Sequence, residues 1–338
     1  MAILSTFSYE DSVDLINREF DAGRLNPLDN SMKSSWIVKV NTVPQNSGWT
    51  RRHKEVPVGE LYADDKAEGA LTTKTRVQQG YYKDTTARTF SKGIDITYEM
   101  RTLNKVQEIY NAANFIGWVC TRREDLNLSL FLSFGTATSY TNRDGRTVDI
   151  STWASQSIWN TAHTLTGSAT TYRNRVANNP AFSEWALELA EDLFVTNIYT
   201  NLGEQVGCSP DTIITTDNPT LVNSVRRLLQ SSAQISAPNA GIVNVYEGKY
   251  KHVILNKLDM NASGVKDATK KNYYILADSK ITSFFHDIYA TEEMHNPAKG
   301  NNWEDIETLD WSFTATSMND SCVVSPRGLI FSSWDWEA

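Results

Sequence analysis

Apolar positions recur along the chain in patterns that predict a protein of mixed helices and strands, with one unusually long helix. Between Leu103 and Phe134 an apolar residue returns every three or four positions, as on the buried face of a helix. A helix of about thirty residues is ~45 Å long, whereas the average helix has about 11–12 residues. We expect it to end at Gly135, because glycine readily adopts the left-handed conformation that closes many helices.

The same periodicity predicts shorter helices at Tyr9–Phe20, Phe182–Leu202 and Pro219–Leu229. Pro219 suits the first turn of its helix, where a missing amide proton costs nothing. The apolar positions of the middle helix, which we expect to face inward, are Phe182, Trp185, Ala186, Leu189, Leu193 and Ile198.

Alternating or short apolar runs predict strands in the rest of the chain. Ser91–Met100 alternates and leads directly into the long helix, and Arg143–Arg146 predicts a turn. The other expected strands are Asp211–Thr216, Ile242–Tyr246, His252–Leu255, Tyr273–Leu276, Ile281–Phe285, Asp310–Ala315 and a closing run over Val323–Ile330. Strands and helices together indicate the α+β class.

The N-terminal part of the chain has few apolar residues with which to build a core. Residues 1–60 are polar and contain Pro27, Pro44 and Pro57, so they predict an extended arm that something else covers, such as another copy of the chain. Residues 58–90 are densely charged, and alternation at Leu71–Val77 and Tyr81–Phe90 predicts a long hairpin. A hairpin without an apolar face is marginal alone, so a flexible surface loop is the alternative.

Composition narrows the function classes. The chain has 338 residues and a net charge of −8, the wrong sign for a protein whose task is to grip nucleic acid. Cys120, Cys208 and Cys322 are widely spaced and predict neither a disulfide framework nor a zinc site. The first residues lack the pattern of a signal peptide, and no apolar run is long enough for a membrane span.

Candidate chemistry is sparse. The five histidines have no metal-ligand spacing, and the run Glu292–His295 lacks the second histidine of a zinc helix. His286 and Asp287 are adjacent, but no paired nucleophile or nucleophile-elbow motif accompanies them. Glycine-rich dinucleotide and phosphate loops are absent. We therefore expect neither catalysis nor a cofactor.

The order of these elements resembles the HK97-like fold of tailed-bacteriophage major capsid proteins, in particular the group with Mu-like head subunits. Thr89–Met100 (TFSKGIDITYEM) resembles that group's strand before the long spine helix. Ile158–Gly167 (IWNTAHTLTG) followed by Asn174 resembles its NTAH loop, with Thr164 where proline is common. Ser325–Ile330 (SPRGLI) resembles its final strand, so the likeness spans roughly residues 85–335.

The resemblance implies a layout and a function. Residues 1–57 would form an N-terminal arm, 58–90 an extended loop, 91–205 with 306–338 a peripheral domain containing the spine helix at about 103–134, and 206–305 an axial domain. Such chains form pentamers and hexamers that close into the icosahedral shell of a virion. The implied partners are further copies of the chain, a portal protein, scaffolding and decoration proteins, and packaged double-stranded DNA held without sequence-specific contact. No cofactor and no membrane are implied.

In this fold the arm and the extended loop reach over neighbouring copies. The charged residues that we therefore expect at contacts between copies are Arg51, Arg52, Lys54, Glu60, Asp64, Asp65, Lys66, Lys74, Arg76, Lys83 and Arg88. Some members cross-link a loop lysine to a neighbour's asparagine, for which Lys66, Lys74 and Lys83 are candidates by location. Because the arm begins almost at Met1, we expect a separate scaffolding protein or none, rather than a cleaved scaffold domain.

Two rival interpretations remain open at this stage. An encapsulin-type compartment shell has the same architecture but packages an enzyme instead of a genome. A soluble enzyme with an unrecognised carboxylate site would differ in size, eluting as a small oligomer where a shell elutes as megadalton particles.

Overall fold

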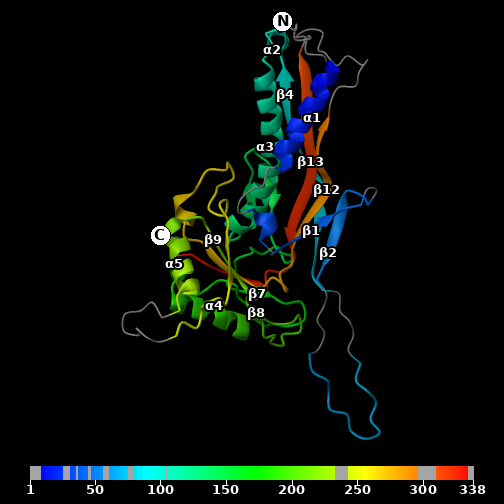
Figure 1. Cartoon of the computed structure of the whole chain (residues 1–338). Coiled ribbons are helices and arrows are strands. Elements are labelled where there is room, and N and C mark those ends of the chain that lie inside the picture. The colour runs from blue at the N-terminus through cyan, green and yellow to red at the C-terminus, as the bar shows by residue number, and fades with distance from the viewer. Residues whose placement is uncertain are drawn as a thin grey trace.

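The structure is a computed structural model that describes residues 9–25, 31–35, 37–44, 47–55, 61–74, 80–103, 105–232, 243–295 and 310–333. An elongated part of the molecule consists of helices α1 and α3 beside a sheet of long strands, and a rounder lobe lies at its lower end (Figure 1). The class is α+β, as the sequence predicts.

The long helix is confirmed as α3, Val106–Ser133. The preceding strand is β4, Arg88–Ile96, so the expectation of a strand up to Met100 is wrong at its end. A short helix, α2 (Tyr98–Thr102), begins there instead. The hydroxyl of Thr97 accepts a hydrogen bond from the backbone amide of Met100 at 3.3 Å, which satisfies one of the free amides of the first turn.

Gly135 has a different role from the expected left-handed cap. The last cap residue, Phe134, has a φ of −102°, and Gly135 is not among the residues with positive φ. A side chain at Gly135 would overlap the indole ring of Trp159. That indole nitrogen donates to the carbonyl of Leu132 at 2.9 Å. Glycine is therefore required here because the ring packs directly on the backbone.

The larger sheet has the strand order β1-β12-β13-β4. Its members besides β4 are β1 (Val38–Thr42), β12 (Phe284–His295) and β13 (Trp311–Val323). The last two are far longer than the expected Ile281–Phe285 and Asp310–Ala315. Between Ala315 and the end of β13 at Cys322 and Val323, the buried positions are Ser317, Asn319 and Ser321, so the apolar alternation stops although the strand continues.

The expectation that the N-terminal arm lacks a core within its own chain is wrong for its described part. Helix α1 (Tyr9–Leu25) lies along α3 and buries Ile16 and Phe20 against it. The two helix backbones can approach closely because Gly23 and Gly117 have no side chain. A Cβ atom at either position would overlap backbone atoms of the other helix. Strand β1 then joins the sheet parallel to β12, after a 3-10 turn, η1 (Met32–Ser34).

This close approach gives a first test. In Gly117→Ala, the added methyl group would overlap the Phe20 carbonyl oxygen and lie 2.9 Å from the Arg24 amide, so α1 must move away from α3. We expect a loss of about 1–3 kcal/mol in the free energy of unfolding, measured by denaturant titration. The matched control is Gly207→Ala, where a Cβ meets nothing within 4 Å. Equal stability of the two variants would contradict this packing.

The lower lobe is built on a second sheet of order β10-β9-β11-β14. Its strands are β9 (Thr212–Thr215), β10 (Lys251–Ile254), β11 (Tyr274–Ala277) and β14 (Leu329–Ser332), and the first three lie close to their predicted positions. The expected closing strand Val323–Ile330 is wrong over most of its length, because Val323 ends β13 and a turn at Arg327 and Gly328 precedes β14. Helices α4 (Glu184–Thr196) and α5 (Pro219–Gln230) share a core with one face of this sheet. The C-terminal half of α3 packs against the other face.

Three details of the lobe differ from expectation. Helix α4 ends at Thr196 rather than Leu202. Trp185 is 61% exposed instead of inward, because Ala186, Leu187 and Ala190 define the buried face of the helix. The expected strand Ile242–Tyr246 is wrong in its described part, where a turn follows Asn244; Ile242 itself lies outside the described residues.

Short hairpins connect the larger elements. The predicted turn at Arg143–Arg146 is confirmed between β5 (Ser139–Thr141) and β6 (Thr147–Asp149), with a φ of 77° at Gly145. Strands β7 (His163–Thr164) and β8 (Thr171–Tyr172) pair within the NTAH-like loop, and η3 (Ala268–Lys270) precedes β11.

Candidate assembly surface

Residues 61–74, which we call the projecting loop, extend away from the body of the molecule (Figure 1). They form no strand, and every one of them is exposed, including Tyr62 at 74% and Leu71 at 95%. The expected strand Leu71–Val77 is therefore wrong for residues 71–74, and its last three residues lie outside the described part. The alternative of a surface loop agrees with the structure.

The projecting loop starts from a short, well-paired hairpin, which we call the root hairpin. Strand β2 (Thr50–Lys54) pairs antiparallel with β3 (Tyr82–Thr86). Across the pair, the guanidinium of Arg52 donates two hydrogen bonds of 2.8 Å to Asp84 and stacks over the ring of Tyr82. These bonds hold the pKa of Asp84 below its usual value. An exposed pair of this kind fixes register more than it adds stability.

A buried carboxylate fastens the root hairpin to the larger sheet. Asp287 on β12 is fully buried and lies 2.5 Å from His53 Nε2 and 2.5 Å from the hydroxyl of Thr85. Arg51 lies 3.4 Å away. Burial alone would raise the pKa of Asp287, but these donors outweigh it and lower the pKa. The His286-Asp287 pair noted in the sequence thus has a positioning role.

The end of the root hairpin next to the projecting loop contacts the motifs that carried the family resemblance. The Glu55 amide donates to the carbonyl of Tyr81 at 2.8 Å, and the Glu55 carboxylate lies 2.8 Å from Arg327 of the SPRG run. Tyr81 stacks on Trp153 with ring centroids 3.8 Å apart, and its hydroxyl accepts from the Thr166 amide. The exposed loop therefore rises from a rigid base.

Four of the expected contact residues already have partners within the chain. Arg51 and Arg52 are engaged as described, Lys83 donates to Asp149 at 3.0 Å and to Ser151, and Arg88 lies 2.9 Å from Asp320. Lys83 is mostly covered, which weakens it as a cross-linking lysine. Exposed members of the set are Lys54, Asp64, Asp65, Lys66 and Lys74, whereas Glu60 and Arg76 lie outside the described residues.

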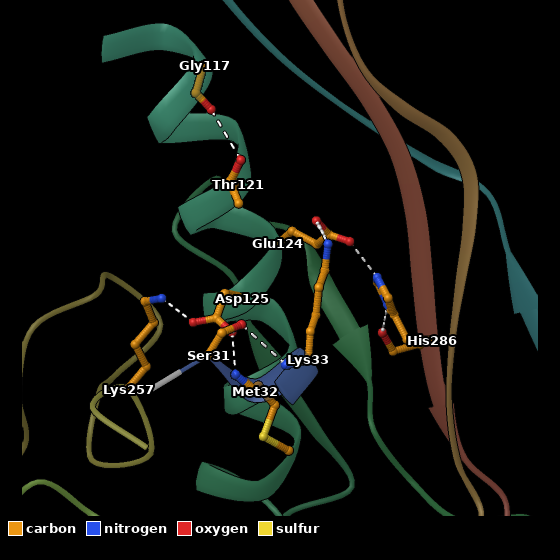
Figure 2. Close-up of polar contacts among 10 residues, drawn as sticks. Ser31, Met32, Lys33, Gly117, Thr121, Glu124, Asp125, Lys257 and His286 are labelled. Carbon is orange, nitrogen blue, oxygen red and sulfur yellow. Dashed lines mark hydrogen bonds and ion pairs between the residues drawn. The ribbon is translucent and has the colours of Figure 1, made fainter. Parts of the chain in front are cut away.

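A second buried network joins the arm, the spine helix and the lobe (Figure 2). Asp125 on α3 accepts from the amide of Met32 at 2.6 Å and from the hydroxyl of Ser31 at 2.8 Å. From another side it forms a buried ion pair with Lys257, which follows β10. One carboxylate thus holds three segments that are far apart in the sequence.

The neighbouring Glu124 contacts both the arm and strand β12 (Figure 2). It forms an ion pair with Lys33, and its Oε1 lies 2.6 Å from His286 Nε2. The other ring nitrogen of His286 lies 2.8 Å from the hydroxyl of Ser321 on β13. Burial acts to raise the pKa of Glu124, but His286 and Lys33 together lower it. No sequence motif marks Glu124 or Asp125, because two charged residues inside a helical repeat normally predict a solvated face.

The lowered pKa values of Glu124 and Asp287 make stability depend on acid. A carboxyl whose pKa is lower when folded contributes stability above its unfolded pKa of about 4, which is lost as the pH falls through the folded pKa. We expect the melting temperature to fall steeply below about pH 4. In Asp287→Asn the acid limb should be shallower, because one of the responsible groups no longer titrates. An identical acid slope in the variant would remove Asp287 from this account.

The described residues were searched for metal ligands, membrane helices and reactive thiols. They contain no group of three potential metal-ligating side chains, and no helix among them is long and apolar enough to cross a membrane. All three cysteines are buried, and burial raises the pKa of Cys120 and Cys208 to about 11, so neither thiol is ionised near neutral pH.

The chain was compared with known proteins. No protein-family model matches it, and no curated protein does. Among solved structures, it is similar to the capsid of an empty GTA particle, with 11% identity over 91% of this chain and 90% of that chain and a TM-score of 0.51. It is also similar to a structure of Gordonia phage Cozz (11% identity, 90% and 87% covered, TM-score 0.50). A third match is the mature capsid of bacteriophage PhiM1 (9% identity, 90% and 87% covered, TM-score 0.50).

At identities this low, the likeness establishes the fold alone. The chain has an α+β, HK97-like fold, and the expectation from the sequence motifs is confirmed at that level. The likeness to the Mu-like group stays a prediction.

Proposed function

We propose that this chain is the major capsid protein of a tailed bacteriophage, which assembles as pentamers and hexamers into an icosahedral shell around double-stranded DNA. The proposal rests chiefly on the projecting loop. A soluble monomer gains nothing by holding Tyr62 and Leu71 largely in water on a rigidly fixed base. A neighbouring copy that covers the loop supplies the missing burial, and symmetry repeats that contact around the shell.

The matched structures support this proposal, since those described as capsids share the fold over about nine-tenths of this chain. The layout into arm, extended loop, peripheral and axial domains, with the boundaries given above, belongs to the same proposal. So do a portal protein, scaffolding and decoration proteins as partners. We place the chain in the virion.

Size and content test the proposal. The purified full chain should form megadalton particles in size-exclusion chromatography and closed shells of uniform diameter in negative-stain micrographs. Particles recovered from an infected or induced host should contain nuclease-protected DNA. A small oligomer at all concentrations would point to the enzyme alternative, and shells filled with a cargo protein would point to a compartment of the encapsulin type.

A further inference from the structure

Helix α4 presents an unusual outer face. Trp185, Glu188, Asp192 and Val195 lie on one stripe, at spacings of three and four residues, and all four are exposed. Trp185 is 61% exposed and Val195 57%. Neither Glu188 nor Asp192 forms an ion pair with another described residue. An exposed tryptophan and valine beside unpaired carboxylates make a surface that is both apolar and acidic.

Helix α5 presents the opposite charge. Arg226 and Arg227 are exposed on its outer face, where they line an open groove together with Asn223, Gln230 and Ser231. In the part of the chain that the structure describes, neither guanidinium has a carboxylate partner. The segment 233–242 that follows the helix carries no charged residue in its sequence. Two positive charges are thus accessible to a partner in a chain whose net charge is −8.

The two faces are outward in the same molecule. The buried sides of α4 and α5, including Leu187, Phe194 and Leu228, belong to one core over the lower sheet, so the opposite sides of both helices face solvent. Figure 1 shows both helices on the outside of the lobe. Contact between the acidic stripe and the basic face therefore requires two copies of the chain.

Building on the proposed function, we infer that α5 of one copy docks against α4 of an adjacent copy. The guanidinium groups of Arg226 and Arg227 then lie against the carboxylates of Glu188 and Asp192 and cover the ring of Trp185. Arginine suits this position because its planar group binds carboxylates in a bidentate manner and stacks on aromatic rings. Since the two faces differ, the contact runs head to tail and propagates from copy to copy.

A second copy fits these faces better than nucleic acid does. Phosphates would satisfy the two arginines, but they would leave the tryptophan and valine of α4 in water and would be repelled by Glu188 and Asp192. A second copy of the chain supplies carboxylates for the two arginines and covers the exposed tryptophan and valine. Each copy also presents one acidic and one basic face, so every face can be paired. Complementary charge also sets the orientation of the approaching copy and speeds association.

Charge reversal and its compensation form the test. Arg226→Glu with Arg227→Glu places like charges in contact, and we expect at least a ~10-fold loss of assembled particles, scored by light scattering and micrographs. Glu188→Arg with Asp192→Arg should cause a similar loss. The fourfold variant carrying all four changes restores opposite charges and should regain assembly. Because all four side chains are exposed, the melting temperature of the unassembled variants should stay near that of the parent chain.

The outcomes separate this contact from the broader proposal. If the arginine-reversed chain forms empty shells as readily as the parent, or if the fourfold variant fails to recover, the α4–α5 contact is refuted while the shell function stands. If the parent chain itself does not assemble, the proposed function fails first. A loss confined to DNA packaging, with normal empty shells, would assign the arginines to nucleic acid and overturn the inference.

Discussion

Replacement of residues 62–73 by a short glycine-serine linker is expected to give a folded chain that no longer forms shells. The segment makes no regular structure and is exposed throughout, so its removal costs the isolated subunit little. In the assembly each copy loses the surface that its neighbour covers, and the loss is repeated at every position of the shell. We expect at least a ~100-fold fall in particle yield, measured by sedimentation, with a melting temperature close to that of the unassembled parent.

Point variants sharpen this experiment. Tyr62→Ser with Leu71→Ser removes two apolar side chains that are 74% and 95% exposed, and should weaken assembly without affecting the fold. Val265→Ser is the matched control, because Val265 is also apolar and 60% exposed but lies in a turn of the lobe. If the chain without its loop assembles at normal yield, the loop is not an assembly element and the main support for the proposed function is lost.

The sequence predicts those elements whose apolar residues follow one period from end to end. Helix α3 is found because its buried side repeats Ile109, Ala113 and Ile116 at spacings of four and three. Strand β13 is found only as far as Ala315, because its inward positions then become polar. Whether a polar residue can be buried in a strand depends on its hydrogen-bond partner in the folded chain. Ser321 contacts His286, which is 35 positions away in the sequence.

The candidate assembly surface was likewise only partly predictable from the sequence. That the charged segment lacks an apolar face is visible from its composition, but which of its charges have partners within the chain is not. Lys83 and Arg88 look like loop charges in the sequence, yet Asp149 and Asp320 take them into the body of the same chain. The packing of the arm could not be predicted for a related reason. In the sequence Gly23 indicates only conformational freedom, whereas in the structure it allows the backbone of α3 to lie against α1.

Substitution of Asp125 should have the largest effect on stability, because this carboxylate is 1% exposed and serves three segments at once. Asp125→Ala leaves the ammonium group of Lys257 buried without its counter-charge, and it also removes the acceptor that the Met32 amide and the Ser31 hydroxyl share. Removing one partner of a buried pair typically costs about 3–5 kcal/mol. We expect a loss of that size in the free energy of unfolding, together with faster hydrogen exchange in the arm.

Two controls identify the cause. Asp125→Ala combined with Lys257→Met leaves no buried lone charge, so it should cost less than the sum of the single changes. Asp144→Ala removes the partner of Arg123 from an ion pair of 3.1 Å whose carboxylate is 68% exposed, and should cost at most about 1 kcal/mol. If Asp125→Ala is no more harmful than Asp144→Ala, the three segments are not held through this carboxylate. The arm would then have to be held to α3 mainly by the ion pair between Lys33 and Glu124.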